Sequence, residues 1–383
     1  MEYQELLHRC FRCGWCKLPL NYVDINCPVY LMYRFESYSP GGRLWLIRAW
    51  LDGDIEMSER LREIIFACAT CKNCVEACAL PKIKDNLVDI VIAARNEIVQ
   101  TGKLPAKVRD YFMKIYEKGN PYGRPQSDRL QWTKGLEVPI YDGHEFLLFI
   151  GDAGSFDESG MEMARSVAQL LNRGGVSFGI LGEDEVSDGN DVYALGEKDL
   201  FTHTANRLVE IFKKRGVRKI ITLSPHAYNA FKNYYPALGA QYDVMHYTHL
   251  IAFRAGKFPA GRMKARVTFH DPCYLGRWNN DYTACRHILS SIPGIELAEM
   301  DRNRENALCC GGGGGNFFTD MLGSGPDSPS RMRVREAMET GADILAVACP
   351  KCKKMIEDAV KDKSAEDSIR VMDVAGILLE GDG

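Results

Sequence analysis

The sequence lacks the long apolar runs that cross membranes. A membrane-spanning helix needs about 20 consecutive apolar residues, and the nearest candidate, Phe146 to Ile150, has only the length of a strand. The N-terminus, Met1 to Glu5, carries neither the basic nor the apolar region of a secretory signal. The whole chain has 51 acidic and 48 basic residues, which gives a net charge of −3. It therefore has no excess of basic side chains that would attract nucleic acid or anionic lipid. We therefore expect a cytoplasmic protein without a membrane span or a nucleic-acid partner.

A dinucleotide-binding fingerprint is also missing. Such a fingerprint places spaced glycines between a strand and a helix, and the stretch from Gly151 to Gly154 does not have that spacing. The glycines from Gly311 to Gly315 directly follow two cysteines. There they are better suited to let the backbone approach a metal centre and donate N–H groups to it. Neither stretch predicts a flavin or nicotinamide site.

Cysteine, by contrast, is abundant, with 14 residues. Disulfides are the first interpretation, and they fit poorly with a chain that shows no secretory signal. Thiolates select zinc, copper(I) or iron–sulfur clusters instead. The cysteine content therefore predicts a metalloprotein of a reducing compartment.

Five of the cysteines form three groups late in the chain. His270 to Cys273 read His-Asp-Pro-Cys, Cys309 to Gly311 read Cys-Cys-Gly, and Cys349 to Cys352 read Cys-Pro-Lys-Cys. Four sulfurs suffice for one zinc ion, so a fifth is surplus. Adjacent cysteines also direct their sulfurs apart, which suits two irons of one cluster better than one tetrahedral ion. The pattern favours an iron–sulfur cluster, with structural zinc as the alternative.

The order Cys, Cys-Cys-Gly, Cys-Pro-x-Cys resembles the cysteine-rich CCG domain of the heterodisulfide reductase family, although the interval from Cys310 to Cys349 is a little long. The resemblance implies one [4Fe-4S] cluster, non-cubane or of a related kind. Its ligands would be Cys273, Cys309, Cys310, Cys349 and Cys352. The overall organisation is also similar to the electron-transfer subunit of class II benzoyl-CoA reductase complexes.

Eight further cysteines form two runs within residues 1–115, one from Cys10 to Cys27 and one from Cys68 to Cys78. The second run has the spacing of two-cluster ferredoxins, in which three close cysteines hold one cluster and the distant fourth holds the other. On that rule cluster A takes Cys10, Cys13, Cys16 and Cys78, and cluster B takes Cys68, Cys71, Cys74 and Cys27. Both would be [4Fe-4S] clusters, and no thiol is left over. Zinc knuckles are the competing interpretation.

Helical periodicity at Arg43 to Leu51, Ser58 to Cys68 and Asp85 to Gln100 predicts that residues 1–115 form an α-helical domain. It resembles the α-helical ferredoxin module at the front of this family. Arg43 is either a solvated helix start or a cation that tunes a cluster. Residues 116–142 predict a linker, because Gly119 to Pro125 are dense in helix breakers.

The remainder predicts two α/β repeats with parallel sheets, residues 143–255 and 256–383, so the fold class is α+β overall. Expected strands are Glu145–Ile150, Val176–Leu181, Arg218–Leu223, Arg266–His270 and Asp343–Cys349. Expected helices are Ser159–Asn172, Lys198–Arg215, Tyr282–Ser291, Pro329–Thr340 and Pro350–Val360.

The first repeat has lost every thiol of the second. Ser224 and Ala227 stand where Cys349 and Cys352 stand in the second repeat. Ser187-Asp188-Gly189 corresponds to Cys309-Cys310-Gly311, and Asp152 corresponds to Cys273. Oxygen and methyl groups do not replace thiolates around such a cluster. We therefore expect this repeat to be a scaffold without metal.

Polar residues near the third cluster are also candidates for roles at the site. His270, Arg277, Arg302 and Arg304 are expected near its mouth, with His270 as a supporting residue rather than a ligand. Cys285 lies in a helical pattern without a partner nearby, which favours a buried structural thiol.

These features predict an iron–sulfur electron-transfer subunit of a strictly anaerobic cytoplasmic complex. It would relay single electrons between a flavoprotein, similar to heterodisulfide reductase A or an electron-transfer flavoprotein, and a catalytic partner. One alternative is a heterodisulfide reductase subunit that cleaves S–S bonds at the CCG cluster, against which the loss of the first repeat's thiols argues. Another is a zinc-stapled interaction protein. The sequence assigns no catalytic residue.

Overall fold

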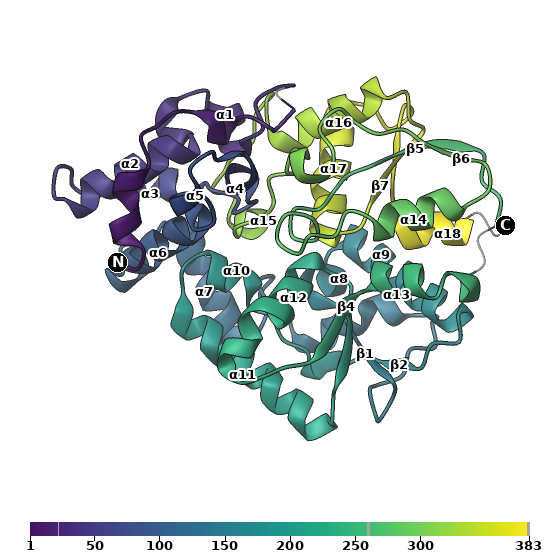
Figure 1. Cartoon of the computed structure of the whole chain (residues 1–383). Coiled ribbons are helices and arrows are strands. Elements are labelled where there is room, and N and C mark those ends of the chain that lie inside the picture. The colour runs from purple at the N-terminus through teal and green to yellow at the C-terminus, as the bar shows by residue number, and fades with distance from the viewer. Residues whose placement is uncertain (22, 259–260, 381–383) are drawn as a thin grey trace.

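A computed structural model describes residues 1–21, 23–258 and 261–380 (Figure 1). A helical N-terminal part lies beside two α/β units, the first of which is at the bottom of the view and the second at the upper right. Among the described helices, none combines the length and the apolar character that a membrane span requires.

The N-terminal part is helical, as predicted. Its α-helices are α1 (Pro28–Tyr33), α2 (Pro40–Leu51), α3 (Glu59–Phe66), α4 (Asn73–Ala77), α5 (Pro81–Lys84), α6 (Leu87–Gln100) and α7 (Ala106–Lys118). Short 3₁₀ helices η1 (Gln4–Arg9), η2 (Trp15–Lys17) and η3 (Glu36–Tyr38) connect the cysteine loops. Serine side chains fix two helix starts, because Ser39 accepts from the Gly42 N–H and Ser58 accepts from the Leu61 N–H.

The connecting segment is irregular where its helix breakers lie. Helix α7 ends at Lys118, and Gly119 caps it with a φ of 68°. The segment then forms the 3₁₀ helix η4 (Gln126–Thr133), in which Arg129 and Trp132 are buried. It therefore packs into the body of the molecule rather than acting as a free tether.

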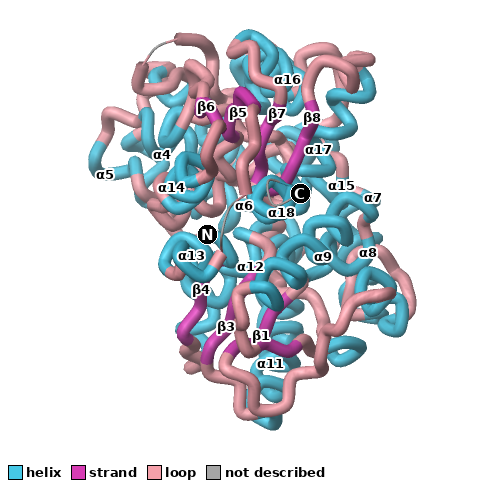
Figure 2. Tube along the Cα trace, turned by 90° about the vertical axis from the view of Figure 1, so that its right-hand side faces the viewer, coloured by secondary structure: helices cyan, strands magenta, loops and turns pink. Residues whose placement is uncertain are grey.

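Two four-stranded parallel sheets follow, and they have the same strand order, β2-β1-β3-β4 and β6-β5-β7-β8. The strands are β1 (Phe146–Phe149), β2 (Phe178–Gly179), β3 (Lys219–Thr222), β4 (Asp243–His246), β5 (Ala265–Phe269), β6 (Ile295–Leu297), β7 (Ile344–Val347) and β8 (Arg370–Asp373). Figure 2 shows one sheet above the other with helices between them. The identical order supports the predicted duplication.

Helices cover both sheets. The first unit has α8 (Gly151–Phe156), α9 (Glu158–Arg173), α10 (Asn190–Ala194), α11 (Lys198–Arg215), α12 (Pro225–Asn229) and α13 (Tyr247–Phe253). The second has α14 (Ala284–Ser291), α15 (Asn316–Thr319), α16 (Pro329–Glu339), α17 (Pro350–Asp362) and α18 (Val374–Glu380). The central strands β1 and β7 are buried along their whole length, as expected for parallel sheets covered on both faces.

Candidate metal centre

Five thiols of the second unit gather beyond the carboxyl end of its sheet. Cys273 follows β5, Cys309 and Cys310 precede α15, and Cys349 and Cys352 flank the start of α17. All five are buried, with exposed fractions between 1% and 7%. The carboxyl edge of an open parallel sheet is where α/β folds place their sites. All fourteen cysteines are free thiols.

The two adjacent cysteines point to different partners. Cys309 Sγ lies 3.9 Å from Cys273 Sγ, whereas Cys310 Sγ lies 3.4 Å from Cys352 Sγ. The Gly311 N–H donates to Cys309 Sγ at 3.3 Å, and Gly311 has a φ of 94°, a conformation that favours glycine. This donor set fits a group with several metal atoms better than a single ion.

The His270 side chain gives an independent test of the fit. Arg333 Nε donates to His270 Nδ1 at 3.2 Å, so Nδ1 is the acceptor and the hydrogen of the neutral ring sits on Nε2. Nε2 is buried without a hydrogen-bond partner of ordinary geometry. The ring clusters with Cys310 and Cys352, whose sulfurs and the ring nitrogen lie within 4.8 Å of one another. A buried donor that faces sulfur fits a thiolate-held cluster.

The surroundings of two of the five thiols, Cys310 and Cys349, favour the thiolate form. Interactions with the neighbouring thiols of Cys309 and Cys352, with a contribution from His270, lower the pKa of the Cys310 thiol well below its usual value. Burial would raise the pKa of the Cys349 thiol, but hydrogen bonds from Cys352 and His226 hold it well below its usual value. Thiolates are the ligating species.

The eight N-terminal thiols form two adjoining sets. The thiol of Cys78 interacts electrostatically with the side chains of Cys13 and Cys10, and the thiol of Cys27 interacts with those of Cys71 and Cys68. The first three of these cysteines are assigned to cluster A by the ferredoxin spacing, and the last three to cluster B. Burial raises the pKa of Cys27 to about 12.

Two further N-terminal thiols lie between the sets. Burial raises the pKa of Cys16 to about 12, and its neighbours include Cys10 as well as Cys27. Cys74, which burial also shifts upward in pKa, faces both Cys68 and Cys16. The two sets therefore adjoin.

The ferredoxin loop of the second set touches the CCG site directly. A hydrogen bond with Cys309 is the largest cause that raises the pKa of the Cys71 thiol well above its usual value, ahead of burial. Cys71, Cys273 and Cys309 belong to one buried cluster of side chains. Cysteine spacing does not indicate this junction, because it joins distant parts of the chain.

Side chains after Cys273 bind the same ferredoxin loop. The buried Arg277 donates from Nε to the Cys71 carbonyl at 2.6 Å. Trp278 Nε1 donates to the Thr70 carbonyl at 2.8 Å, and the hydroxyls of Tyr274 and Thr70 lie 2.8 Å apart. Arg277 thus lies beside the predicted ligands, as expected, and it fixes the junction between the two domains.

Two other arginines direct their guanidinium groups to carboxylates. Arg302 is buried, but it pairs with Glu336 and donates to the Ile25 carbonyl rather than facing the thiols. Arg304 is about half exposed and lies 3.5 Å from Glu299. Both guanidinium groups form ion pairs with nearby carboxylates. The cysteine spacing contains no information about these ion pairs.

Arg43 is not a solvated helix start. It is buried, and it donates to the carbonyls of Ile64 and Tyr38 at 3.0 and 3.1 Å. Its charge lowers the pKa of the Cys27 thiol against the larger effect of burial. Its position supports the alternative of a cation beside cluster B. Cys285 is buried near Thr248, in keeping with a structural thiol.

The thiol-free positions of the first unit also converge. Among the residues that line a cavity of about 10 Å³ are Asp152, Ser187, Asp188 and Ser224, the counterparts of four of the second unit's thiols. We call these four residues the silent site. Arg129 of η4 pairs with Asp152 at 2.5 Å and with Glu185 at 3.3 Å. Sequence reasoning missed Arg129, because its polar neighbours in η4 make it look like an ordinary solvated residue.

One side chain from each of the two α/β units extends toward the site of the other unit. Lys351 and His226 occupy corresponding positions in Cys-Pro-Lys-Cys and Ser-Pro-His-Ala. Lys351 reaches into the first unit and bonds Asp191, 160 residues away. His226 lies on the other side of this contact, where it helps to lower the pKa of the Cys349 thiol. The first α/β unit therefore contributes a side chain, His226, to the surroundings of the five thiols of the second unit.

The surroundings of the silent site predict a pH dependence. Burial raises the pKa of Glu185 to about 7, and Arg129 opposes that shift. In the folded protein the Glu185 carboxyl therefore keeps its proton at pH values at which the same carboxyl in the unfolded chain has already lost it. The stability from this group is complete below about pH 4.5 and is lost as the pH rises through about 7. Glu185→Gln should therefore reduce the fall in the urea midpoint between about pH 5.5 and about pH 8, and an unchanged fall would contradict the assignment.

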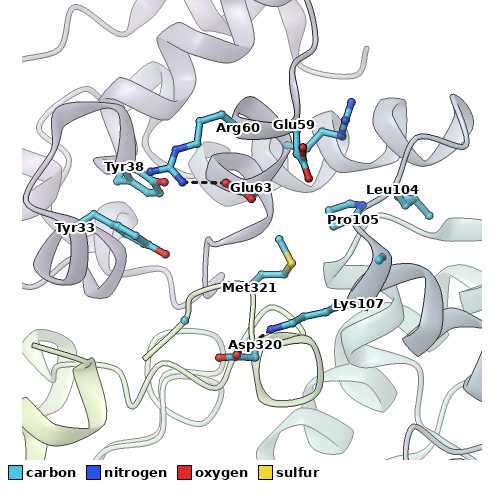
Figure 3. Close-up of a pocket in the computed structure, with 13 residues that line it drawn as sticks. Tyr33, Tyr38, Glu59, Arg60, Glu63, Leu104, Pro105, Lys107, Asp320 and Met321 are labelled. Carbon is cyan, nitrogen blue, oxygen red and sulfur yellow. Dashed lines mark hydrogen bonds and ion pairs between the residues drawn. The ribbon is translucent and has the colours of Figure 1, made fainter. Parts of the chain in front are cut away.

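A surface cavity of about 570 Å³ lies between α3, the start of α7 and the loop after α15 (Figure 3). Its charged lining residues are Glu59, Glu63, Asp320, Arg60, Arg62 and Lys107. The pairs Arg60–Glu63 and Lys107–Asp320, at 2.9 and 3.0 Å, lie in its wall. Because acidic and basic groups balance, the cavity does not favour a ligand of either sign, and we assign none.

Comparison with known proteins agrees with the geometry. Residues 267–357 match the family described as the cysteine-rich domain CCG, and residues 6–80 match the 4Fe-4S dicluster domain. The chain is thus an iron–sulfur protein of the oxidoreductase class, with a dicluster ferredoxin module and a CCG domain. It is 30% identical to a dihydromethanophenazine:CoB–CoM heterodisulfide reductase subunit of Methanosarcina barkeri, over 98% of this chain and 94% of that protein. The chain belongs to the heterodisulfide reductase family.

Two longer relatives are also similar. "Probable iron-sulfur-binding oxidoreductase FadF" of Bacillus subtilis is 36% identical over 86% of this chain and 48% of that protein. "EtfAB:quinone oxidoreductase" of Syntrophomonas wolfei is 30% identical over 97% of this chain and 58% of that protein. The chain therefore spans about half the length of these two relatives. A hypothetical protein from Helicobacter pylori shares the fold, with a TM-score of 0.58 at 12% identity, over 100% of this chain and 73% of that one.

Proposed function

We propose that the chain is the electron-transfer subunit of a multisubunit oxidoreductase. The observation that carries this proposal is the contact between Cys71 and Cys309, which makes the ferredoxin module and the CCG domain share one buried junction. Electron transfer weakens steeply with distance, so adjoining cofactor sites suit a relay. Arg277 and Trp278 hold the two loops together through backbone carbonyls.

The ligand assignment of the relay follows the grouping of thiols. Cluster A would be held by Cys10, Cys13, Cys16 and Cys78, cluster B by Cys68, Cys71, Cys74 and Cys27, and the third cluster by Cys273, Cys309, Cys310, Cys349 and Cys352. We propose [4Fe-4S] clusters at all three, the third of them non-cubane because Cys309 and Cys310 point apart. When bound, these groups supply one-electron transfer.

Burial favours the relay over disulfide cleavage at the CCG site. A substrate disulfide has to reach the metal-bound sulfurs, and the five thiols are at most 7% exposed. The neighbouring silent site offers a cavity of only about 10 Å³, roughly enough for one water molecule. Pockets for organic ligands are on the order of 300 Å³ or more. An electron carrier does not need such access.

The partner we propose is a flavoprotein similar to heterodisulfide reductase A or an electron-transfer flavoprotein. The relative from Syntrophomonas wolfei is an EtfAB:quinone oxidoreductase, and this supports the choice of a flavoprotein partner. A catalytic subunit would receive or supply the electrons at the other end. We place the complex in the cytoplasm because all fourteen cysteines are free thiols.

Anaerobic purification followed by iron and sulfide analysis tests this proposal. We expect about twelve iron atoms and a similar amount of sulfide per chain, and stepwise bleaching of the brown colour on reduction. Electron paramagnetic resonance should separate the third centre from the other two. A colourless protein with a few zinc ions would refute the proposal.

A further inference from the structure

The proposed ligands of cluster A are most exposed at the loop that carries Cys13. Cys13 is the one exposed thiol among the fourteen. The loop around it turns at Arg12 and Gly14, whose φ angles are 56° and 87°. A partner that exchanges electrons with the chain over a short distance can therefore dock at this loop without any rearrangement.

Two aromatic side chains flank the exposed thiol. Phe11 is 64% exposed and Trp15 is 45% exposed, on either side of Cys13 in the chain. Neighbouring exposed aromatic residues are uncommon on a surface that faces only water. Aromatic residues are enriched in protein interfaces because they contribute a large contact area.

Basic side chains surround this loop. His8 and Arg9 lie in η1, which packs against α5 with Lys82 and Lys84. The charges of Arg12 and Lys84 lower the pKa of the Cys10 and Cys78 thiols, against the larger effect of burial, so both cations face cluster A.

These charges are left without acidic partners. Residues 8–17 and 79–84 contain no acidic residue. Within the described part of the chain, no ion pair joins Arg9, Lys82 or Lys84 to a carboxylate, and the nearest pair in the loop is Lys17 with Glu36. A basic patch with free charges is therefore present on a chain whose net charge is −3.

We propose that this cluster A face, defined by His8, Arg9, Phe11, Arg12, Trp15, Lys82 and Lys84, is the docking surface for an acidic flavoprotein. Unpaired basic groups around an aromatic centre complement an acidic rim around an exposed flavin edge. One electron leaves the partner's reduced flavin, and the chain is reduced by that one electron. The inference rests on the proposed function. It adds that the flavoprotein partner is acidic and that it binds at the cluster A face of this chain.

Charge reversal at two exposed positions tests the docking surface. Arg9→Glu combined with Lys82→Glu changes no ion pair of the fold, because both side chains are exposed and lie outside its described ion pairs. The probe is reduced flavodoxin, an acidic one-electron flavoprotein, mixed with the oxidised holoprotein in a stopped-flow instrument. We expect the second-order rate constant to fall by about tenfold or more, and its decrease with salt to weaken. Phe11→Ser should lower the rate without changing the salt dependence.

The matched control is Lys213→Glu combined with Lys214→Glu, which makes the same charge change in the last turn of α11, away from the N-terminal helices (Figure 1). This variant should react as the wild type does. Equal rates and equal salt dependence for the Arg9/Lys82 variant and the wild type would overturn the docking proposal. Failure of the wild type to be reduced even by dithionite, a small reductant that needs no docking, would instead refute the proposed function.

Discussion

Replacing Cys310 by serine is expected to remove about four of about twelve iron atoms per chain and to leave the other two clusters intact. Cys310 Sγ lies 3.4 Å from Cys352 Sγ, and the proposed ligand set of the third cluster shares no residue with the eight N-terminal thiols. A serine hydroxyl ionises far less readily than a thiol and binds iron poorly in its place. Iron analysis and the loss of one resonance component measure the effect.

The control for this experiment is Cys285→Ser. Cys285 is a buried thiol of the same unit, 3% exposed, and its side chain bonds Thr248. A hydroxyl can replace that hydrogen bond, so this variant should keep its full iron content. Unchanged iron in Cys310→Ser, or equal loss in both variants, would contradict the assignment of Cys310 as a ligand.

Much of the fold can be predicted from local patterns. The helix Lys198–Arg215 is predicted with both of its ends correct, because its apolar spacing is regular, Glu197 caps its start and Gly216 follows its end. The strands β4, β6 and β8 are missed. They have three or four residues and are partly exposed, so only their pairing with neighbouring strands defines them.

The parts of the site that depend on the spacing of cysteines can be predicted from the sequence. The contacts that depend on the packing of distant segments cannot. The groups of cysteines stand out in the sequence because each lies in one short loop. The ion pair of Lys351 with Asp191 joins residues 160 positions apart, and no spacing rule reaches that far. Arg95 is also missed, although a charged residue among the apolar residues of α6 could have suggested a buried role.

Arg95 joins all three parts of the molecule. Its side chain is fully buried and donates to the carbonyls of Cys68 at 2.7 Å and Phe66 at 2.8 Å, both at the cluster B loop. It also donates to the Ala194 carbonyl of the first α/β unit at 2.7 Å and to the Gly314 carbonyl of the second at 3.4 Å. Burial lowers the pKa of Arg95 to about 10, so the guanidinium stays charged at neutral pH.

Arg95→Met is therefore expected to destabilise the whole protein. Methionine fills a similar volume but donates no hydrogen bond, and each buried carbonyl left without a donor costs about 1–3 kcal/mol. The free energy of unfolding should fall by more than about 3 kcal/mol, out of about 5–15 kcal/mol for a typical protein. The urea midpoint, followed anaerobically, measures the change.

The matched control is Arg48→Met, which removes a partly exposed arginine from α2 that pairs with Asp52 at 3.3 Å. An exposed pair contributes about 0–1 kcal/mol, so the midpoint should barely move. Iron content adds a second readout, because the carbonyls of Cys68 and Gly314 belong to loops that carry thiols of cluster B and of the third cluster. Arg95→Met should lose iron from both sites, whereas Cys310→Ser loses it from one. Equal midpoints for the two arginine variants would show that the carbonyls around Arg95 are satisfied in another way.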